Sequence, residues 1–169
     1  MPDPLLMTVY ELLERQLAQF REALEGIPEE DLNTWKPSGE DAGGGEMNTF
    51  AALAVHIAAA GTWRVFQQVY GDEVHRDREA EFRATATHDE IAQLFDTWLA
   101  GYRERLERPV QPDLGSLPDT PREDHPDWTR MRWLLTTLDH TALHLGHVQI
   151  HRQLWTAERG RSTLNDSTG

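Results

Sequence analysis

The chain has 169 residues, no cysteine and a formal net charge of −13. This length fits one domain with a sizeable core, and the lack of cysteine excludes disulfides, thiolate zinc sites and a cysteine nucleophile. The acidic balance, with arginines scattered among acids, argues against nucleic-acid binding. No stretch approaches the roughly 18 consecutive apolar residues of a membrane span, so we expect a soluble, cytoplasmic protein.

The first half of the chain predicts two helices. One runs over about residues 8–26, where apolar residues recur on one stripe and Thr8 and Glu11 form a capping-box pattern. The next runs over about residues 48–70 and ends before a Gly-Asp pair. Residues 31–45 lie between them and end in three glycines, a composition typical of a mobile loop.

The second half predicts two more helices. The third begins at a capping box formed by Thr87 and Glu90 and ends before Pro109. The fourth spans about residues 128–158. Five prolines occur in residues 109–126, a connection too long for a tight antiparallel turn, which indicates a long Pro-rich crossover between helices three and four.

These segments predict an all-α protein, a four-helix bundle formed by a single domain over residues 1–158. The polar tail over residues 159–169 is expected to be disordered.

Four histidines, at 140, 144, 147 and 151, lie within a narrow arc of the fourth helix because their spacing is i, i+4, i+7, i+11. A helix bundle normally places leucine on such a face. Neutral imidazole is the commonest side-chain metal ligand, so the stripe predicts a metal site in the bundle.

The strongest ligand candidates are His56, His140 and His144. Side chains at i and i+4 project side by side, and a third imidazole from a facing helix completes an open three-histidine site. In the alternative, the buried histidines bond one another and polar side chains without metal. If a metal is bound, His147 is expected to lie next to the ligands or to face the substrate, and His151 is expected to lie near the bundle end, beyond reach of the same ion.

The remaining histidines, His75, His88 and His125, fall in polar loops or caps and are expected to be solvated. Ferritin-like dinuclear sites are excluded because the predicted core faces lack the required glutamates. A serine nucleophile is excluded because no GxSxG pattern occurs.

The chain resembles the DinB-like superfamily of metal-binding four-helix bundles, which includes the mycothiol-dependent maleylpyruvate isomerase and bacillithiol transferase groups. The resemblance covers nearly the whole chain. It is carried by residues 31–37 (DLNTWKP), by 53–57 (LAVHI) with Trp63, and most specifically by 139–149 (DHTALHLGHVQ).

The resemblance implies a DinB-like bundle in which His56, His140 and His144 hold a divalent metal, the same three residues that the spacing indicates. It also implies a homodimer, a small-molecule substrate and a low-molecular-weight thiol as co-substrate. The ion is expected to be zinc, nickel or iron, since imidazole suits each of them.

Three functional hypotheses follow. In the leading one, the ion lowers the pKa of a bound thiol or water, and the protein is a bacillithiol- or mycothiol-type S-transferase, or a related metal-dependent hydrolase, with His147 as proton shuttle. The second is a non-catalytic metal-binding or ligand-sensing bundle. The third is a structural bundle whose metal site has decayed.

Overall fold

The computed structural model describes residues 3–37 and 48–166, with side chains described as far as Gly160. The described part is helical and contains no strand beyond one isolated bridge between Arg122 and His125. Its elements are α1 (Pro4–Leu24), α2 (Glu29–Thr34), α3 (Phe50–Thr62), the π-helix η1 (Trp63–Val69), α4 (Arg78–Glu81), α5 (His88–Leu106) and α6 (Arg130–Asp166). The expected all-α four-helix bundle is confirmed.

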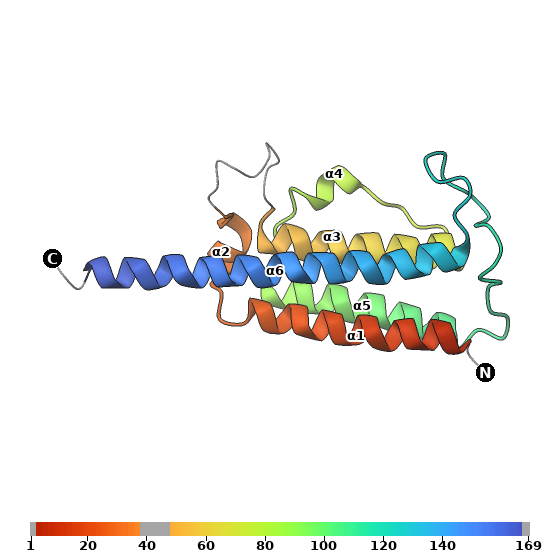
Figure 1. Cartoon of the computed structure of the whole chain (residues 1–169), viewed down its shortest axis with the longest axis horizontal. Coiled ribbons are helices and arrows are strands. Elements are labelled where there is room, and N and C mark those ends of the chain that lie inside the picture. The colour runs from red at the N-terminus through yellow and green to blue at the C-terminus, as the bar shows by residue number, and fades with distance from the viewer. Residues whose placement is uncertain (1–2, 38–47, 167–169) are drawn as a thin grey trace.

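The bundle consists of α1, α3 with η1, α5 and α6 (Figure 1). Helices α5 and α6 each pack against both α1 and α3, so α5 and α6 occupy diagonal corners. Tyr102, near the end of α5, donates to the carbonyl of Leu6 at the start of α1, so these two helices are antiparallel. Helices α1 and α6 run one way along the bundle, and α3 and α5 run the other way.

Two long connections join the helices, one because its helices are parallel and the other because its helices lie at diagonal corners. Because α3 and α5 are parallel, residues 71–87 return along the length of the bundle, and α4 lies in this connection (Figure 1). The Pro-rich connection between α5 and α6 does cross the bundle, but it does so diagonally over one end. Arg130 fastens that end, because its guanidinium donates to the carbonyl of Val69 and to the carboxylate of Asp119.

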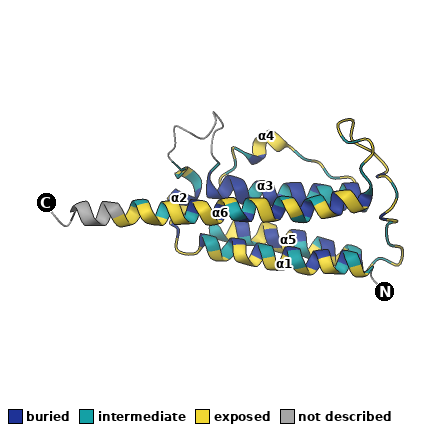
Figure 2. Cartoon of the chain, viewed as in Figure 1, coloured by how far each residue is buried: buried dark blue, intermediate teal, exposed yellow. Residues whose placement is uncertain are grey.

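The core is formed by the inward faces of the four long helices (Figure 2). Phe20 of α1 and Phe95 of α5 are fully buried and meet edge to face, with ring centroids 5.4 Å apart. Burial of such a ring stabilises the fold by about 1.5–3 kcal/mol. On α3, small residues allow close packing, and the buried indole of Trp98 occupies the space where Gly61 lacks a side chain.

Helix ends match the sequence pattern in one case and differ in another. The Thr87 and Glu90 capping box is present at the start of α5, with both reciprocal hydrogen bonds formed. The expected Thr8 and Glu11 box is wrong, because α1 begins earlier, at Pro4. Asp3 caps α1 by accepting from two backbone N–H groups, and proline is well suited to the first helical position.

The second expected helix, over residues 48–70, is two elements. Thr49 caps α3 by accepting from the backbone N–H of Ala52, and the backbone changes to π-helical geometry at Trp63. Gly71 follows with a positive φ of 79°, a conformation that glycine adopts without steric cost. The change from α to π geometry rotates the residues from Trp63 onward relative to a continuous α-helix.

Two expectations about irregular segments are corrected. Part of the expected loop over residues 31–45 is helical, because α2 extends to Thr34. Helix α2 contacts α6, where the indole N–H of Trp155 donates to the carboxylate of Asp31. The three glycines lie outside the described residues. Helix α6 continues to Asp166, so most of the expected disordered tail is helical. None of the described helices is both long enough and apolar enough to cross a membrane.

Candidate metal centre

The three predicted ligands meet between α3 and α6. His56 comes from α3, and His140 and His144 lie one turn apart on α6. The Nε2 atom of His140 lies 3.1 Å from Nε2 of His56 and 3.2 Å from Nε2 of His144. The ligand atoms that the three residues offer all lie within 4.8 Å of one another. Two antiparallel helices thus bring three imidazole nitrogens to one point.

These distances fit a three-histidine metal site. Nitrogens about 2.0–2.1 Å from a tetrahedral zinc ion are about 3.3 Å from one another, close to the observed spacings. The hydroxyls of Thr137 and Thr141 donate to helix carbonyls of α6. They therefore do not donate to the rings, whereas the contacts of His140 with His56 and His144 are also of hydrogen-bond length. The donor set of three imidazoles suits zinc, nickel and iron alike.

A carboxylate binds His56, the third predicted ligand, through the ring nitrogen that faces away from the other two imidazoles. Glu81 of α4 accepts from Nδ1 of His56 at 2.8 Å, and Arg76 binds both carboxylate oxygens of Glu81 at 2.6 and 2.8 Å. A hydrogen on Nδ1 leaves the Nε2 lone pair free and aimed at the other two imidazoles. This is the arrangement by which proteins orient a metal-binding histidine.

Sequence reasoning did not identify Glu81 or Arg76. Glu81 is 25 residues from His56 in the chain, and the segment that carries both residues has no strong helical periodicity. A glutamate and an arginine five residues apart are common on protein surfaces. Only the return of the chain across α3 makes this pair part of the site.

The site keeps its imidazoles neutral, the form that binds metal. Burial, together with the positive charge of Arg64, lowers the pKa of His140 to about 2 and that of His144 to about 4. Burial also lowers the pKa of His56. Burial raises the pKa of Glu81, but hydrogen bonds from Arg76 and His56 outweigh that effect and hold it below its ordinary value.

The other two histidines of the stripe have different surroundings. His147 is exposed, and its ring centroid is 5.3 Å from that of His144, so it lies beside the centre. His151 is buried, and its ring meets Trp35 and Phe50 edge to face. His151 is therefore part of an aromatic cluster and does not join the three ligands.

Of the histidines expected to be solvated, two make specific contacts. His88 donates from Nε2 to the carbonyl of Ile27 at 2.8 Å, and His125 stacks on Trp128 with ring centroids 3.8 Å apart. The third, His75, is exposed. None of the three approaches the metal centre.

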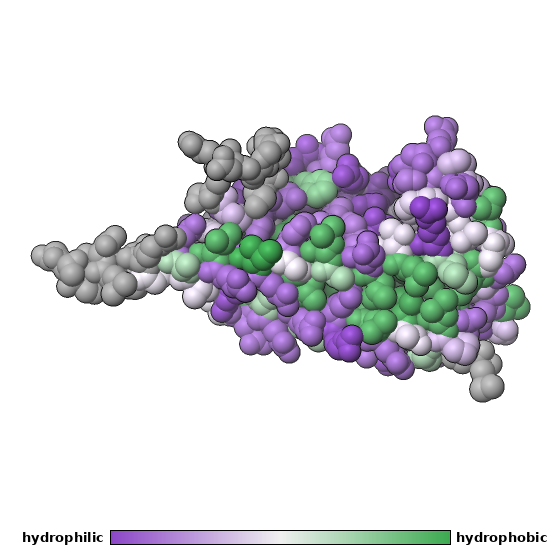
Figure 3. All heavy atoms as spheres, in the orientation of Figure 1, coloured by the Kyte–Doolittle hydropathy of each residue, from purple (hydrophilic) through white to green (hydrophobic). Residues whose placement is uncertain are grey.

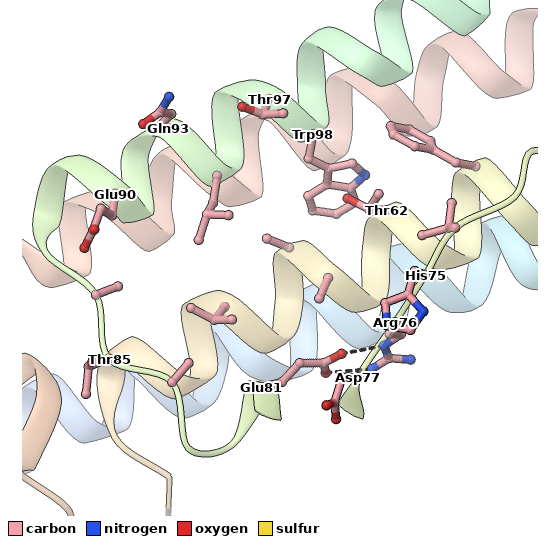
Figure 4. A pocket seen from close by; sticks show the side chains of 18 residues that line it. Thr62, His75, Arg76, Asp77, Glu81, Thr85, Glu90, Gln93, Thr97 and Trp98 are labelled. Atoms are coloured by element: carbon pink, nitrogen blue, oxygen red, sulfur yellow. Dashed lines mark hydrogen bonds and ion pairs between the residues drawn. The ribbon is translucent and has the colours of Figure 1, made fainter. Parts of the chain in front are cut away.

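A cavity of about 700 Å³ lies on the other side of α3 from α6, between α3, α5 and residues 74–86 (Figure 4). Its apolar wall includes Phe66, Leu94 and Trp98, and Glu81 and Arg76 lie at its edge. The histidines of α6 do not line it. Glu81 thus borders the cavity and also orients His56. The segment of residues 74–86 therefore contacts both the cavity and the candidate metal centre.

Comparisons with known proteins agree with this architecture. Residues 8–157 match the family described as mycothiol-S-transferase, which is a DinB-like family. The crystal structure of a conserved protein from Enterococcus faecalis is similar, with a TM-score of 0.63 and 16% sequence identity over 88% of this chain and 95% of that chain. At this identity the likeness shows the fold. No curated protein matches the chain.

Proposed function

Because the chain belongs to the mycothiol-S-transferase family, we propose that it is a metal-dependent enzyme that transfers a low-molecular-weight thiol of the mycothiol type to an electrophilic small molecule. The observation that carries this proposal is the convergence of three neutral imidazoles from two helices on one point. Three protein ligands form an open centre, the kind found at catalytic metal sites.

Each residue of the site has a separate role in this proposal. His56, His140 and His144 would hold a divalent ion, and Glu81 fixes the orientation of His56. When bound to three neutral ligands, such an ion keeps its positive charge and lowers the pKa of a thiol near it. His147 is exposed beside His144, where it can accept the thiol proton and pass it to solvent.

The reaction balances without a redox partner. The thiol loses its proton, and its sulfur forms a bond to an electrophilic carbon. The bond from that carbon to its leaving group breaks, and the leaving group departs with the electron pair. Where the electrophile has no leaving group, the proton returns to the adduct.

The test is a thiol-transfer assay on protein reconstituted with zinc, nickel or iron. Mycothiol, bacillithiol and glutathione are each supplied with chlorodinitrobenzene and with a panel of activated esters and epoxides, and the thiol adduct is quantified. We expect adduct formation that requires metal and is lost in His144→Ala. Hydrolysis products without adduct would instead identify a hydrolase. Metal binding without turnover of any pair would support a non-catalytic bundle.

We also propose that the protein is a homodimer that pairs through α6. Large apolar side chains are exposed along this helix (Figure 3), and Leu143 and Ile150 are both more than half exposed, at 56% and 54%. The exposed apolar residues of α6 are Met131, Leu135, Leu143, Ile150 and Leu154. Several exposed apolar side chains on one helix are typical of an interface, and a two-fold pairing would bury them on both copies.

A further inference from the structure

The cavity between α3, α5 and residues 74–86 is separate from the candidate metal centre. Its volume of about 700 Å³ lies within the range of about 300–1,000 Å³ that is typical of small-molecule sites. None of His56, His140 and His144 lines it, and α3 lies between the cavity and α6 (Figure 4). The fold therefore contains a space for a small molecule that is not the space around the three imidazoles.

The space exists because α3 presents small side chains to α5. The residues of α3 that line the cavity are Val55, Ala58, Ala59 and Thr62. They share one face of the helix because their spacing is i, i+3, i+4, i+7. The exposed residues of α5 that line it are Gln93, Leu94 and Thr97. The cavity is therefore open to solvent along α5, and a molecule can enter there.

The wall of the cavity suits an aromatic molecule with a polar substituent. The rings of Phe66 and Trp98 line it, together with the apolar side chain of Leu94, and aromatic rings pack favourably against one another. Thr62 also lines the cavity, and its hydroxyl makes no capping hydrogen bond to η1. This hydroxyl can therefore bond a carbonyl or hydroxyl group of a ligand.

The charged groups at the cavity favour a neutral ligand. Three carboxylates and one guanidinium line it, so an anion would meet a net negative charge. Each carboxylate already has a partner, because Glu81 accepts from two side chains, Asp77 accepts from the backbone N–H of Ala80 and Glu90 forms the capping box of α5. A cation would compete with these partners, whereas an uncharged molecule would leave them in place.

Residues 74–86 contact both the cavity and His56. Glu81 lines the cavity and accepts from Nδ1 of His56 at 2.8 Å. Arg76 also lines the cavity, and it donates to Glu81. The ring of Phe82 stacks on the imidazole of His56, with centroids 4.7 Å apart. A change in the position of this segment would therefore change the cavity and the orientation of His56 together.

We propose that the cavity is a second ligand site, which takes an uncharged aromatic molecule and is coupled to metal binding through residues 74–86. A ligand that contacts α3, α5 and this segment stabilises the arrangement in which Glu81 and Phe82 hold His56. Metal binding favours the same arrangement, so each event strengthens the other, and the coupling is reciprocal. The proposal rests on the candidate metal centre and not on the thiol chemistry.

The ligand class is tested with two dyes that differ by one charge. N-phenyl-1-naphthylamine is uncharged, and 8-anilinonaphthalene-1-sulfonate has the same rings with an added sulfonate. Each is titrated into zinc-loaded protein, and its fluorescence is measured. We expect saturable binding of one neutral dye per chain and at least about tenfold weaker binding of the sulfonate. A neutral dye that does not saturate, or a sulfonate that binds as tightly, would overturn the proposal.

The place of binding is tested with Ala59→Phe, which puts a ring into the cavity. Ala18→Phe is the matched control, because Ala18 is an exposed residue of α1. We expect Ala59→Phe to weaken binding of the neutral dye at least about tenfold, and Ala18→Phe to change it less than about twofold. If circular dichroism shows that Ala59→Phe does not fold, Thr97→Phe at the open side of the cavity replaces it. Equal effects of the cavity variant and the control would contradict the assignment.

The coupling is tested by measuring the Kd of the neutral dye on zinc-loaded and metal-free protein, with the fold of each verified by circular dichroism. We expect zinc to tighten dye binding at least about fivefold, and saturating dye to tighten zinc binding by the same factor. Glu81→Gln should reduce this factor, whereas Glu79→Gln, at an exposed residue of α4, should preserve it. Dye binding of equal strength with and without zinc would overturn the proposal. Failure of the proposed function is distinguishable, because neither measurement requires thiol transfer.

Discussion

At the scale of single residues, Glu81 decides how well His56 can serve as a ligand. Its carboxylate takes the Nδ1 hydrogen of His56 and is itself held at both oxygens by Arg76. This fixes the ring's orientation and the nitrogen that faces the other imidazoles. A free histidine at the same position would rotate and exchange tautomers, and its metal affinity would be lower.

Replacing Glu81 by glutamine should weaken metal binding about 10- to 100-fold, because an amide is a poorer acceptor for the Nδ1–H group. The measurement is competition for zinc against a fluorescent chelator. Glu79→Gln is the matched control, since Glu79 is an exposed residue of the same short helix. An affinity unchanged by Glu81→Gln would show that this carboxylate does not support the site.

His144 and His151 should respond in opposite ways to substitution by alanine. His144→Ala removes one of three converging nitrogens, so we expect loss of bound metal and of activity. His151→Ala leaves the centre intact but removes a ring packed against Trp35 and Phe50, with a stability loss of about 1–3 kcal/mol. Metal content and urea unfolding are measured on both. Equal metal loss in the two variants would show that the proposed position of the site is wrong.

At the scale of elements, α3 can approach α5 closely because it has little side-chain volume on that face. A Cβ on Gly61 would lie 2.1–2.7 Å from three atoms of the Trp98 indole, which is 2% exposed and cannot move aside. The glycine is therefore required for packing, although it lowers helix propensity.

Gly61→Ala should destabilise the protein by about 1–3 kcal/mol through overpacking against Trp98. Gly146→Ala provides the control within another helix, because a Cβ there meets nothing within 4 Å. That change should stabilise the protein by about 0.8–1 kcal/mol through helix propensity alone. Urea unfolding of the two variants gives the comparison, and a shift of the same sign in both would refute this account of Gly61.

At the scale of the whole molecule, the candidate metal centre joins the two halves of the chain. His56 belongs to the first half, whereas His140 and His144 belong to the last helix. An ion that binds only the folded bundle stabilises it by about 4 kcal/mol at a thousandfold excess over its Kd. Metal binding at this place would therefore contribute to the stability of the entire fold.

Removal of metal by a chelator should lower the Tm of the protein, and restoring zinc should reverse the change. The measurement is calorimetry on protein whose metal content is determined before and after treatment. His144→Ala is the control and should have a low Tm that does not respond to chelator. An unchanged Tm after verified metal removal would contradict the link between the centre and folding.

The proposed homodimer should depend on the exposed apolar residues of α6. Leu143→Glu places a charge at a residue that is 56% exposed, so it should lower the stability of the monomer only slightly. In the dimer the same charge would be buried without a partner, so the two copies should separate. Sedimentation velocity measures the change. Glu22→Gln on α1 serves as a control for altered net charge and should remain dimeric. A wild-type protein that sediments as a monomer would contradict the proposed pairing.

The sequence by itself determined the features that depend on neighbours in the chain. Helical periodicity predicted the four long helices, and the spacing of His140 and His144 placed them side by side on one face. The Thr87 and Glu90 box predicted the start of α5. These inferences hold because hydrogen bonds and side-chain directions within a helix repeat over three to four residues. His56, the third predicted ligand, was named as a core-directed histidine of a facing helix, and the resemblance to a family motif indicated the same residue.

Only the tertiary structure decided what depends on contacts between distant segments. The pairing of His56 with Glu81 and the aromatic surroundings of His151 both require knowing which helices are neighbours. The lengthwise return of residues 71–87 follows from the parallel packing of α3 and α5. No local pattern encodes these features, because burial and electrostatic pairing are set by the packing of the whole chain.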